Sequence, residues 1–421
     1  MRHLYKILRP IKPLIKAILP SKAWDRLRWY VFFKPKKTKA PPSGFYDASL
    51  PQGVNLIGIL RAGNSIGVLG RLVAQALTAA EIPFCVIDIS EYFIITPCNA
   101  EYEHKESVKQ KYNVNLIAVN ADSLPVVSIS LDQADMRKRF NIGYWAWELA
   151  EFPDIWQSAF EMYKEIWTLS TFCTSSVEKK SPVPVLTVPL HTGKLGSCIN
   201  NGREYFSIPH NVFLFMIAYD CNSYVERKNP QASVRAFMDA FSPEDRHVGL
   251  VLKLSYPENY RSHIKELLET LSEYPNIFYF DKYLSDVEIR TLVNISDTFV
   301  SLHRSEGFGL IPLEAMALGT PVIATAWSGN MDYMNHKNAA LVDYTLVPVN
   351  GQYVATTPEE DYMWAEPDIA EAAEHMRRLV SDKVWREELI NNGKATANTF
   401  FSAENMGKII RKRLQALGLL D

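Results

Sequence analysis

The sequence contains little cysteine and no long apolar run, and both absences narrow the class of protein. Its 421 residues include five cysteines, which are widely spread and form no Cys-x-x-Cys pair. This pattern argues against a disulfide framework or a zinc site and is typical of a reducing cytosol. No apolar stretch is long enough to span a bilayer as a helix. We therefore expect a cytoplasmic protein that does not cross the membrane.

Several nucleotide-binding and catalytic signatures are also missing. The chain has no P-loop, no Gly-x-Ser-x-Gly and no Asp-x-Asp, the acidic pair that often clamps a metal–nucleotide complex. Its nine histidines show no metal-ligand spacing. The glycine-rich stretch 61–70 does not match the Gly-x-Gly-x-x-Gly dinucleotide pattern. These absences predict a site that works without a bound metal or cofactor.

Charge is balanced over the whole chain but not along it. The 45 Lys+Arg and 47 Asp+Glu give a net charge of -2, which excludes nucleic-acid binding by bulk positive charge. Residues 1–40 hold twelve basic residues and one acid, a net of +11, so the remaining 33 bases and 46 acids give -13. Apolar and basic residues recur there at helical spacing, although Pro10 and Pro13 interrupt the pattern. This segment is expected either to contact an anionic membrane surface or to form a solvated tail on the acidic body.

Short apolar runs alternate with helical stretches twice along the chain. In the first half the apolar runs cover 55–60, 84–89, 114–119, 126–129, 165–169 and 185–188, with a helix ending at 80. In the second half the runs 212–218, 248–254, 277–280, 298–302 and 322–324 alternate with helices at 230–241, 264–271, 287–293 and 312–318. Such alternation predicts parallel sheets covered by helices. We expect an α/β protein of two doubly wound domains, with the carboxyl ends of their strands facing a deep cleft.

This pattern also predicts the domain boundaries. Residues 1–44 would form the basic segment and a linker, 45–200 a first Rossmann-like domain, 201–385 a second, and 386–421 a helical tail. The polar, glycine-containing stretch 193–210 is the expected hinge.

The most informative segment runs from Ser301 to Thr325, SLHRSEGFGLIPLEAMALGTPVIAT. A strand ends in a polar loop with two glycines, and a helix begins near Pro312. The amides of residues 307–310, at a helix start, suit an anion or sugar hydroxyls. Glu306 and Glu314 suit pairs of vicinal hydroxyls, because each carboxylate oxygen accepts hydrogen bonds. A plain surface loop before a capped helix is the alternative.

This segment resembles the Glu-x7-Glu signature of family 4 retaining glycosyltransferases (glycosyl transferases group 1), which have the GT-B fold of two Rossmann-like domains. The resemblance covers most of residues 55–385 and is strongest over 297–343. It implies that Glu306 contacts hydroxyls of the donor sugar and that Glu314 holds the ribose of the nucleotide. The sugar and phosphate site would be lined by Gly307, Phe308, Gly309 and Leu310.

A second match to this family is the segment Glu226-Arg-Lys-Asn-Pro230. The resemblance implies that an arginine and a lysine here grip the diphosphate of the donor, and preorganised cations would stabilise its departure. Lys228 falls at the family lysine, whereas Ser223 stands where the family arginine usually lies. Arg227 or Arg304 is therefore expected to supply the second charge. The alternative is a solvated basic pair at a helix start.

The first half contains a segment that resembles the acceptor side of these enzymes. In Tyr144-Trp-Ala-Trp-Glu148, the Glu148 carboxylate would orient or deprotonate an acceptor hydroxyl. Trp145 and Trp147 are expected either to stack on sugars or to lie in the core.

A glycine-rich loop at 61–70 resembles the loop on the cleft floor of this family. Its candidate residues are Gly63, Asn64 and Gly67. A tight strand–helix turn is an equally good interpretation.

These features predict a retaining, metal-independent glycosyltransferase that moves a sugar from a UDP- or GDP-linked donor to a hydroxyl of a glycan or lipid-linked acceptor. The basic segment 1–40 indicates an acceptor near the cytoplasmic face of a membrane, as in surface polysaccharide biosynthesis. A non-catalytic nucleotide-sugar-binding partner or scaffold stays open because of Ser223. A GT-B-fold epimerase or phosphorylase also stays open. A nicotinamide-dependent oxidoreductase has only the general α/β pattern in its favour.

Overall fold

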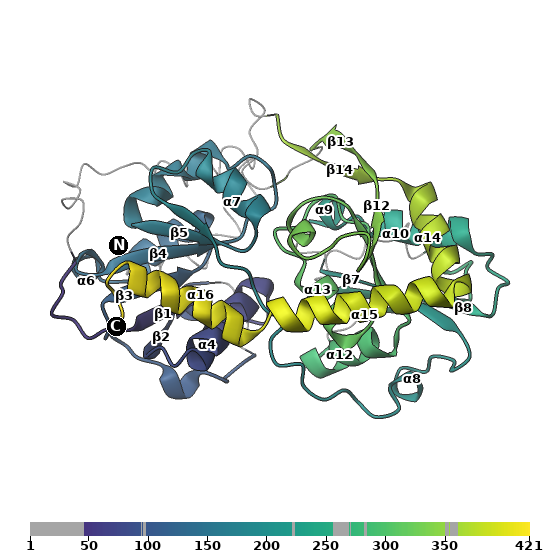
Figure 1. The fold of residues 1–421 in the computed structure, drawn as a ribbon, viewed down its shortest axis with the longest axis horizontal. Helices are drawn as coiled ribbons and strands as arrows, with labels where there is room; N and C mark the ends of the chain where they lie inside the picture. Colours follow the sequence, from purple (N-terminus) through teal and green to yellow (C-terminus); the bar gives the residue numbers. More distant parts are fainter. Residues whose placement is uncertain are drawn as a thin grey trace. The chain divides into compact units, whose positions relative to one another are not determined.

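The computed structural model describes residues 46–421 except positions 94, 96, 97, 221–223, 256–268, 270, 282, 283, 350–352 and 354–360. These residues form two compact units (Figure 1). One contains the described residues up to Leu190 together with Ala403–Asp421, and the other contains His191–Tyr353 and Asp361–Ser402. The basic segment 1–40, Ser223 and most of the expected helix 264–271 lie outside the described residues.

The first unit is built on a parallel sheet with the strand order β2-β1-β3-β4-β5-β6. Its strands are β1 (Val54–Gly58), β2 (Phe84–Asp88), β3 (Val114–Ala118), β4 (Phe140–Trp145), β5 (Glu165–Thr168) and β6 (Val185–Thr187). Its α-helices are α4 (Ser65–Ala79), α5 (Leu124–Ser130), α6 (Gln133–Arg137), α7 (Thr171–Glu178) and α16 (Ala403–Ala416). The helix α16 packs along α4, far from it in sequence (Figure 1).

A row of buried asparagines crosses this sheet. Asn55 of β1, Asn115 of β3 and Asn141 of β4 stand opposite one another in register. The side-chain Nδ2 of Asn55 donates to Oδ1 of Asn115 at 2.9 Å, and Nδ2 of Asn115 donates to Oδ1 of Asn141 at 2.7 Å. A shift of one residue in any of these strands would break the row, so it specifies their register.

The second unit is built on another parallel sheet, with the strand order β12-β11-β10-β7-β8-β9. Its strands are β7 (Phe213–Asp220), β8 (Val248–Ser255), β9 (Ile277–Phe280), β10 (Thr298–Ser301), β11 (Val322–Thr325) and β12 (Ala340–Val342). Its α-helices are α8 (Gly202–Tyr205), α9 (Val225–Lys228), α10 (Pro230–Ala240), α12 (Asp286–Ile295), α13 (Leu310–Leu318), α14 (Ile369–Ser381) and α15 (Lys383–Phe400). A separate antiparallel pair consists of β13 (Tyr344–Pro348) and β14 (Met363–Pro367).

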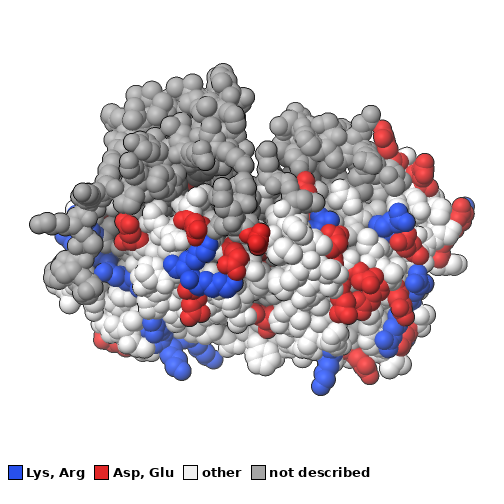
Figure 2. All heavy atoms as spheres, turned by 90° about the horizontal axis from the view of Figure 1, so that it is seen from above, with Lys and Arg blue, Asp and Glu red and all other residues white. Residues whose placement is uncertain are grey.

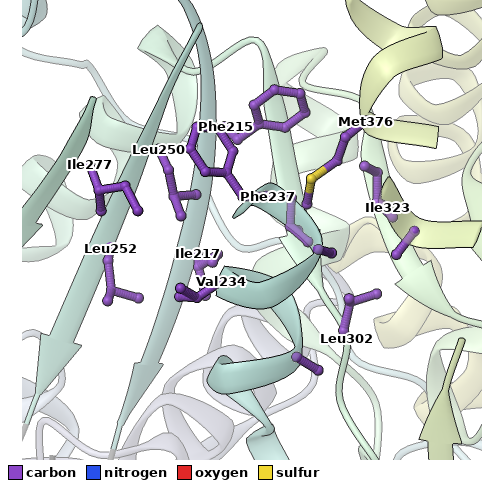
Figure 3. Packing of buried hydrophobic residues seen from close by; sticks show 14 of the residues in the cluster. Phe215, Ile217, Val234, Phe237, Leu250, Leu252, Ile277, Leu302, Ile323 and Met376 are labelled. Atoms are coloured by element: carbon purple, nitrogen blue, oxygen red, sulfur yellow. The ribbon is translucent and has the colours of Figure 1, made fainter. Parts of the chain in front are cut away.

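The core of the second unit includes the space between its sheet and the helices α10 and α14. Phe215 and Ile217 of β7 lie near Val234 and Phe237 of α10 (Figure 3), and the rings of Phe215 and Phe237 are 5.9 Å apart. Met216, between the two β7 residues, is buried on the opposite face of the sheet. Burial on both faces is what a parallel sheet covered by two helix layers requires.

The predicted class, an α/β protein with two parallel sheets, is confirmed. The run 126–129, expected with the strands, instead lies in α5, where Pro125 occupies the first turn and favours a helix start. Strand β4, strands β12 to β14 and helix α14 were not predicted. The helical tail forms two helices, with α15 in the second unit and α16 in the first. The two units divide between Leu190 and His191, just before the expected hinge.

Charges of both signs are mixed on the face shown in Figure 2, over the part of the surface that the described residues form. None of the described helices combines the length and the apolar character that a bilayer crossing needs.

Candidate functional site

Two loops at the carboxyl ends of β10 and β11 hold Glu306 in place. The first, residues 302–309, leads from β10 to α13, and the second is the turn around Ser328. The hydroxyl of Ser328 accepts a hydrogen bond from the Glu306 amide at 2.8 Å, and the Gly329 amide donates to the Glu306 carbonyl at 2.9 Å. A Cβ atom on Gly329 would lie 2.1 Å from the carbonyl oxygen of Gly307, so this close contact requires glycine.

The buried His303 connects the same two loops. Its Nε2 lies 3.1 Å from both the Trp327 carbonyl oxygen and Oδ1 of Asn330, and its Nδ1 lies 3.1 Å from the Ser301 hydroxyl. Nδ1 also lies 3.1 Å from the Ser301 carbonyl oxygen, so each ring nitrogen has a main-chain acceptor within hydrogen-bond distance and the imidazole can donate to either loop. Burial lowers the pKa of His303, so a neutral imidazole braces the loop.

Two cations of α9 meet the carboxylate of Glu306. Nη1 of Arg227 lies 3.1 Å from Oε2 of Glu306 and donates to the Ser305 carbonyl at 2.7 Å. Nζ of Lys228 donates to the other carboxylate oxygen, Oε1. The Arg227 and Glu306 side chains are buried, whereas 25% of the Lys228 side chain is exposed. Two positive charges and one negative charge leave this cluster with a net charge of +1.

This cluster keeps Glu306 ionised. Burial alone would raise the pKa of Glu306, but the charges of Lys228 and Arg227 outweigh burial and lower the pKa to about 2. The carboxylate therefore only accepts hydrogen bonds at neutral pH. Among the described residues, no group of three or more His, Cys, Asp or Glu side chains is placed to hold a metal ion.

Glu314 occupies a different environment on α13. It is partly buried, near Arg290 and Asp286 of α12. Burial raises the pKa of Glu314 to about 8; Arg290 opposes this shift and Asp286 adds to it. The carboxyl group is therefore mostly protonated at neutral pH and can both donate and accept a hydrogen bond.

Residues 307–310 precede and begin α13, where amides have no acceptor within the helix. The side chain of Phe308, by contrast, is buried against Tyr333 and Phe401, with ring centroids 5.4 and 6.0 Å away. The Tyr333 hydroxyl donates to the carbonyl of Gly309. Any contact of Phe308 with a ligand would therefore be made by its main chain.

Arg304 has partners of its own, separate from the Glu306 carboxylate. Its guanidinium pairs with Glu366 of β14 and donates to the Glu226 carbonyl at 2.6 Å. Arg227 and Arg304 were alternatives for the second positive charge at the donor diphosphate, and that assignment stays a prediction. In the structure Arg227 contacts Glu306, whereas Arg304 pairs with Glu366. No local sequence signal identified Glu366, which is 62 residues from Arg304 and is brought to it only by the fold.

The predicted residues of the glycine-rich loop and the acceptor segment belong to the first unit. Asn64 caps α4, because its Oδ1 accepts from the Gly67 amide at 3.0 Å. Gly63 is exposed in the turn before this cap, and Glu148 is partly buried in the segment after β4. Lys228 and Glu306 therefore lie in the second unit, whereas Gly63, Asn64, Gly67 and Glu148 lie in the first.

The two tryptophans beside Glu148 are core residues. Trp145 stacks on Phe152 with 5.8 Å between ring centroids, and Trp147 meets Trp156 edge-on at 4.9 Å. Both indoles are almost fully buried, so their faces are occupied by the protein and the core interpretation holds.

The Glu306 cluster lies inside a segment that matches a known family. Residues 222–396 match the family model of the Glycosyl transferases group 1. The match includes α9, the 302–309 loop and α13. This part of the chain therefore carries a Glycosyl transferases group 1 domain.

Solved structures show the same fold over most of the chain. The sucrose-phosphate synthase of Thermosynechococcus elongatus superposes with a TM-score of 0.61 at 16% identity, covering 87% of this chain and 99% of that chain. Anabaena HepE in complex with UDP and glucose gives a TM-score of 0.59 at 15% identity, covering 87% of this chain and 100% of that chain. At these identities the likeness establishes the fold alone, which is GT-B.

Curated relatives match a shorter part of the chain. The capsular polysaccharide biosynthesis glycosyltransferase CapM of Staphylococcus aureus is 28% identical over 134 residues, which are 32% of this chain and 29% of CapM. The matches to the curated relatives span between 25% and 29% of those proteins' own length.

Proposed function

We propose that this protein is a retaining, metal-independent glycosyltransferase that moves a sugar from a UDP- or GDP-linked donor to a hydroxyl of a glycan or lipid-linked acceptor. The observation that carries the proposal is the meeting of Arg227 and Lys228 at Glu306, which leaves one net positive charge in the loop that leads into α13. A diphosphate gains negative charge as its bond to the sugar breaks, and fixed cations stabilise that charge. The family match over residues 222–396 supports the same activity.

Each group of the cluster has a role in donor binding. Lys228 and Arg227 hold the diphosphate, with amides of residues 307–310 contributing further donors. The ionised Glu306 accepts hydrogen bonds from the sugar hydroxyls, and the protonated Glu314 donates and accepts at the ribose. The likeness to HepE, which was solved with UDP and glucose, supports a nucleotide-sugar donor.

Retention follows if the acceptor attacks the same face of the sugar from which the diphosphate leaves. The bond between the anomeric carbon and the phosphate oxygen breaks, and a bond to the acceptor oxygen forms on that face. The acceptor proton passes to the departing phosphate oxygen. Lys228 and Arg227 carry the developing charge, so neither a covalent enzyme nucleophile nor a metal ion takes part.

The proposed acceptor rests on fewer observations than the proposed donor. The similarity to CapM, a glycosyltransferase of capsular polysaccharide biosynthesis, supports a role in polysaccharide biosynthesis. The net charge of residues 1–40 supports an acceptor near an anionic membrane surface on the cytoplasmic side. Glu148, in the first unit, is the proposed group that orients the acceptor hydroxyl.

Donor binding and transfer are tested with one panel of compounds. UDP, GDP and their common sugar conjugates should raise the melting temperature of the wild-type protein, since a ligand of the folded state stabilises it. With the best donor and a set of glycan acceptors, Lys228→Ala and Glu306→Ala should each lower transfer by about 100-fold or more. The control is Arg235→Ala, which removes an exposed ion pair with Asp239 in the same unit.

Three further measurements separate the parts of the proposal. Normal turnover in EDTA is expected for a metal-independent enzyme, and NMR of the product should show the anomeric configuration of the donor. Binding of a nucleotide-sugar without turnover would support a non-catalytic partner instead. Near-wild-type transfer by both Lys228→Ala and Glu306→Ala would refute the assignment of the site.

A further inference from the structure

Helix α9, which carries both cations of the site, is too short to be stable by itself. It contains one turn, Val225–Lys228, and is flanked by Tyr224 and Asn229, which have positive φ angles of 61° and 50°. A helix of this length lacks the cooperative hydrogen bonds that stabilise longer ones. Its orientation must therefore be set by contacts with other parts of the fold.

Arg304 supplies such contacts at the carboxyl end of α9. Its backbone amide donates to the carbonyl of Arg227 at 2.8 Å, and Nη1 of its guanidinium donates to the carbonyl of Glu226 at 2.6 Å. Carbonyls in the last turn of a helix have no partner within that helix. Arg304 therefore binds the α9 carbonyls at the positions of Glu226 and Arg227, directly before Lys228.

The other side of Arg304 is fixed by strand β14. Nε of Arg304 donates to Oε2 of Glu366, and the Ala365 amide donates to the Arg304 carbonyl at 2.9 Å. The guanidinium also lies over the ring of Trp364, 5.4 Å from its centroid, and that ring is almost fully buried. Three consecutive residues of β14 thus contact Arg304: Ala365 binds its main-chain carbonyl, while Trp364 and Glu366 contact the guanidinium that binds α9.

We propose that Arg304 is a positioning residue that holds the cations of α9 in place through Glu366, and that the β13–β14 pair is a structural support of the donor site. This inference rests on the proposed function, because the cations are proposed to bind the donor diphosphate. It differs from the sequence expectation, in which Arg304 was itself a candidate ligand of the diphosphate. The two roles predict opposite effects when Glu366 loses its charge.

The discriminating experiment compares Glu366→Gln with Arg304→Lys in the full-length protein, using UDP and GDP as probes. If Arg304 acts by positioning α9, both substitutions weaken binding of the preferred nucleotide by about five- to tenfold. A lysine cannot make the two directed bonds of the guanidinium, so it does not replace arginine here. The double variant should be about as weak as the single ones, because both remove one connection.

A direct contact between Arg304 and the diphosphate would give a different result. Glu366→Gln would then release the guanidinium from a competing carboxylate, and nucleotide binding would be unchanged or tighter. That outcome would overturn the positioning role. Asp239→Asn is the matched control, since it removes the charge of an exposed carboxylate paired with Arg235 in the same unit.

A ligand-free measurement keeps this inference separate from the proposed function. Hydrogen exchange of the amides of residues 224–229, measured without nucleotide, should be faster in Glu366→Gln and Arg304→Lys than in Asp239→Asn. Unchanged exchange would overturn the inference. If the wild-type protein binds neither UDP nor GDP while exchange still responds, the proposed donor fails and the structural link between β14 and α9 stands.

Discussion

Glu306 and Glu314 are eight residues apart and have opposite environments. Lys228 and Arg227 lower the pKa of Glu306 to about 2 in spite of its burial, whereas burial raises the pKa of Glu314 to about 8. Their contributions to the free energy of unfolding therefore change with pH in opposite directions. Stability from Glu306 is present above its ordinary pKa of 4.5 and is lost as pH falls toward 2. Stability from Glu314 is present below 4.5 and is lost as pH rises toward 8.

The substitution Glu314→Gln tests this difference. A glutamine has no charge to bury at any pH, so the variant should be more stable than wild type at pH 9 by about 1 to 2 kcal/mol. At pH 4, where Glu314 is protonated, the two proteins should differ little. Urea unfolding at both pH values measures the difference, with the exposed Glu374→Gln on α14 as the control. An equal effect of Glu314→Gln at both pH values would contradict the raised pKa.

The row of buried asparagines in the first sheet should contribute to the free energy of unfolding. Replacing Asn115 by leucine removes the donor to Oδ1 of Asn141 and the acceptor of Asn55. Leaving a buried polar group without its partner should lower the free energy of unfolding by about 1 to 3 kcal/mol.

Denaturant unfolding of the two variants Asn115→Leu and Gln157→Leu makes the comparison. The second variant removes an exposed hydrogen bond, which the side-chain amide of Gln157 donates to Asp154 in the same unit. It should change the free energy of unfolding by less than about 0.5 kcal/mol. Similar values for both variants would show that the buried row does not stabilise the sheet.

The elements that could be predicted from the sequence are those with a strong local pattern. Strand β9 matches its predicted range, and α13 begins two residues before the predicted helix start. The helix α5 was placed with the strands because a short apolar run does not distinguish a buried helix from a strand. Strand β14, which carries Glu366, is separated from its pairing partner β13 by the segment between Pro348 and Met363. No short sequence pattern therefore predicts this strand pair.

The same distinction applies to the candidate site. The segments holding Lys228, Glu306 and Glu314 were identified from short motifs, since each motif lies within one stretch of chain. Two partners that lie outside these motifs were not identified: Glu366, which pairs with Arg304, and Arg290, which lies near Glu314. Glu366 and Arg290 reach the site region through other elements, and sequence spacing does not report a contact made by folding.

The helix α16, which follows the second unit in sequence, packs on α4 within the first unit. A Cβ atom on Gly407 would lie 2.4 Å from the carbonyl oxygen of Ala76, and Arg411 donates to the carbonyl of Ala80 at 2.7 Å. Arg413 pairs with the buried Glu165 at 2.6 Å. The last helix is thus an integral part of the first unit.

The substitution Gly407→Val should therefore destabilise the first unit, by about 2 to 4 kcal/mol. Nucleotide binding, which we assign to the second unit, should change little at temperatures where the protein is folded. Calorimetry and nucleotide titration measure the two effects. The neighbouring exposed substitution Lys408→Val is the control for helix propensity, and equal melting temperatures of the two variants would contradict the close packing.

The division of the first unit between both ends of the chain has a consequence for its biosynthesis. Helix α16 follows every residue of the second unit in sequence, so the ribosome makes it after the second unit. The nascent first unit must wait, with the surface of α4 uncovered, until the second unit has been translated. The usual order, in which the amino-terminal domain is finished first, is reversed here.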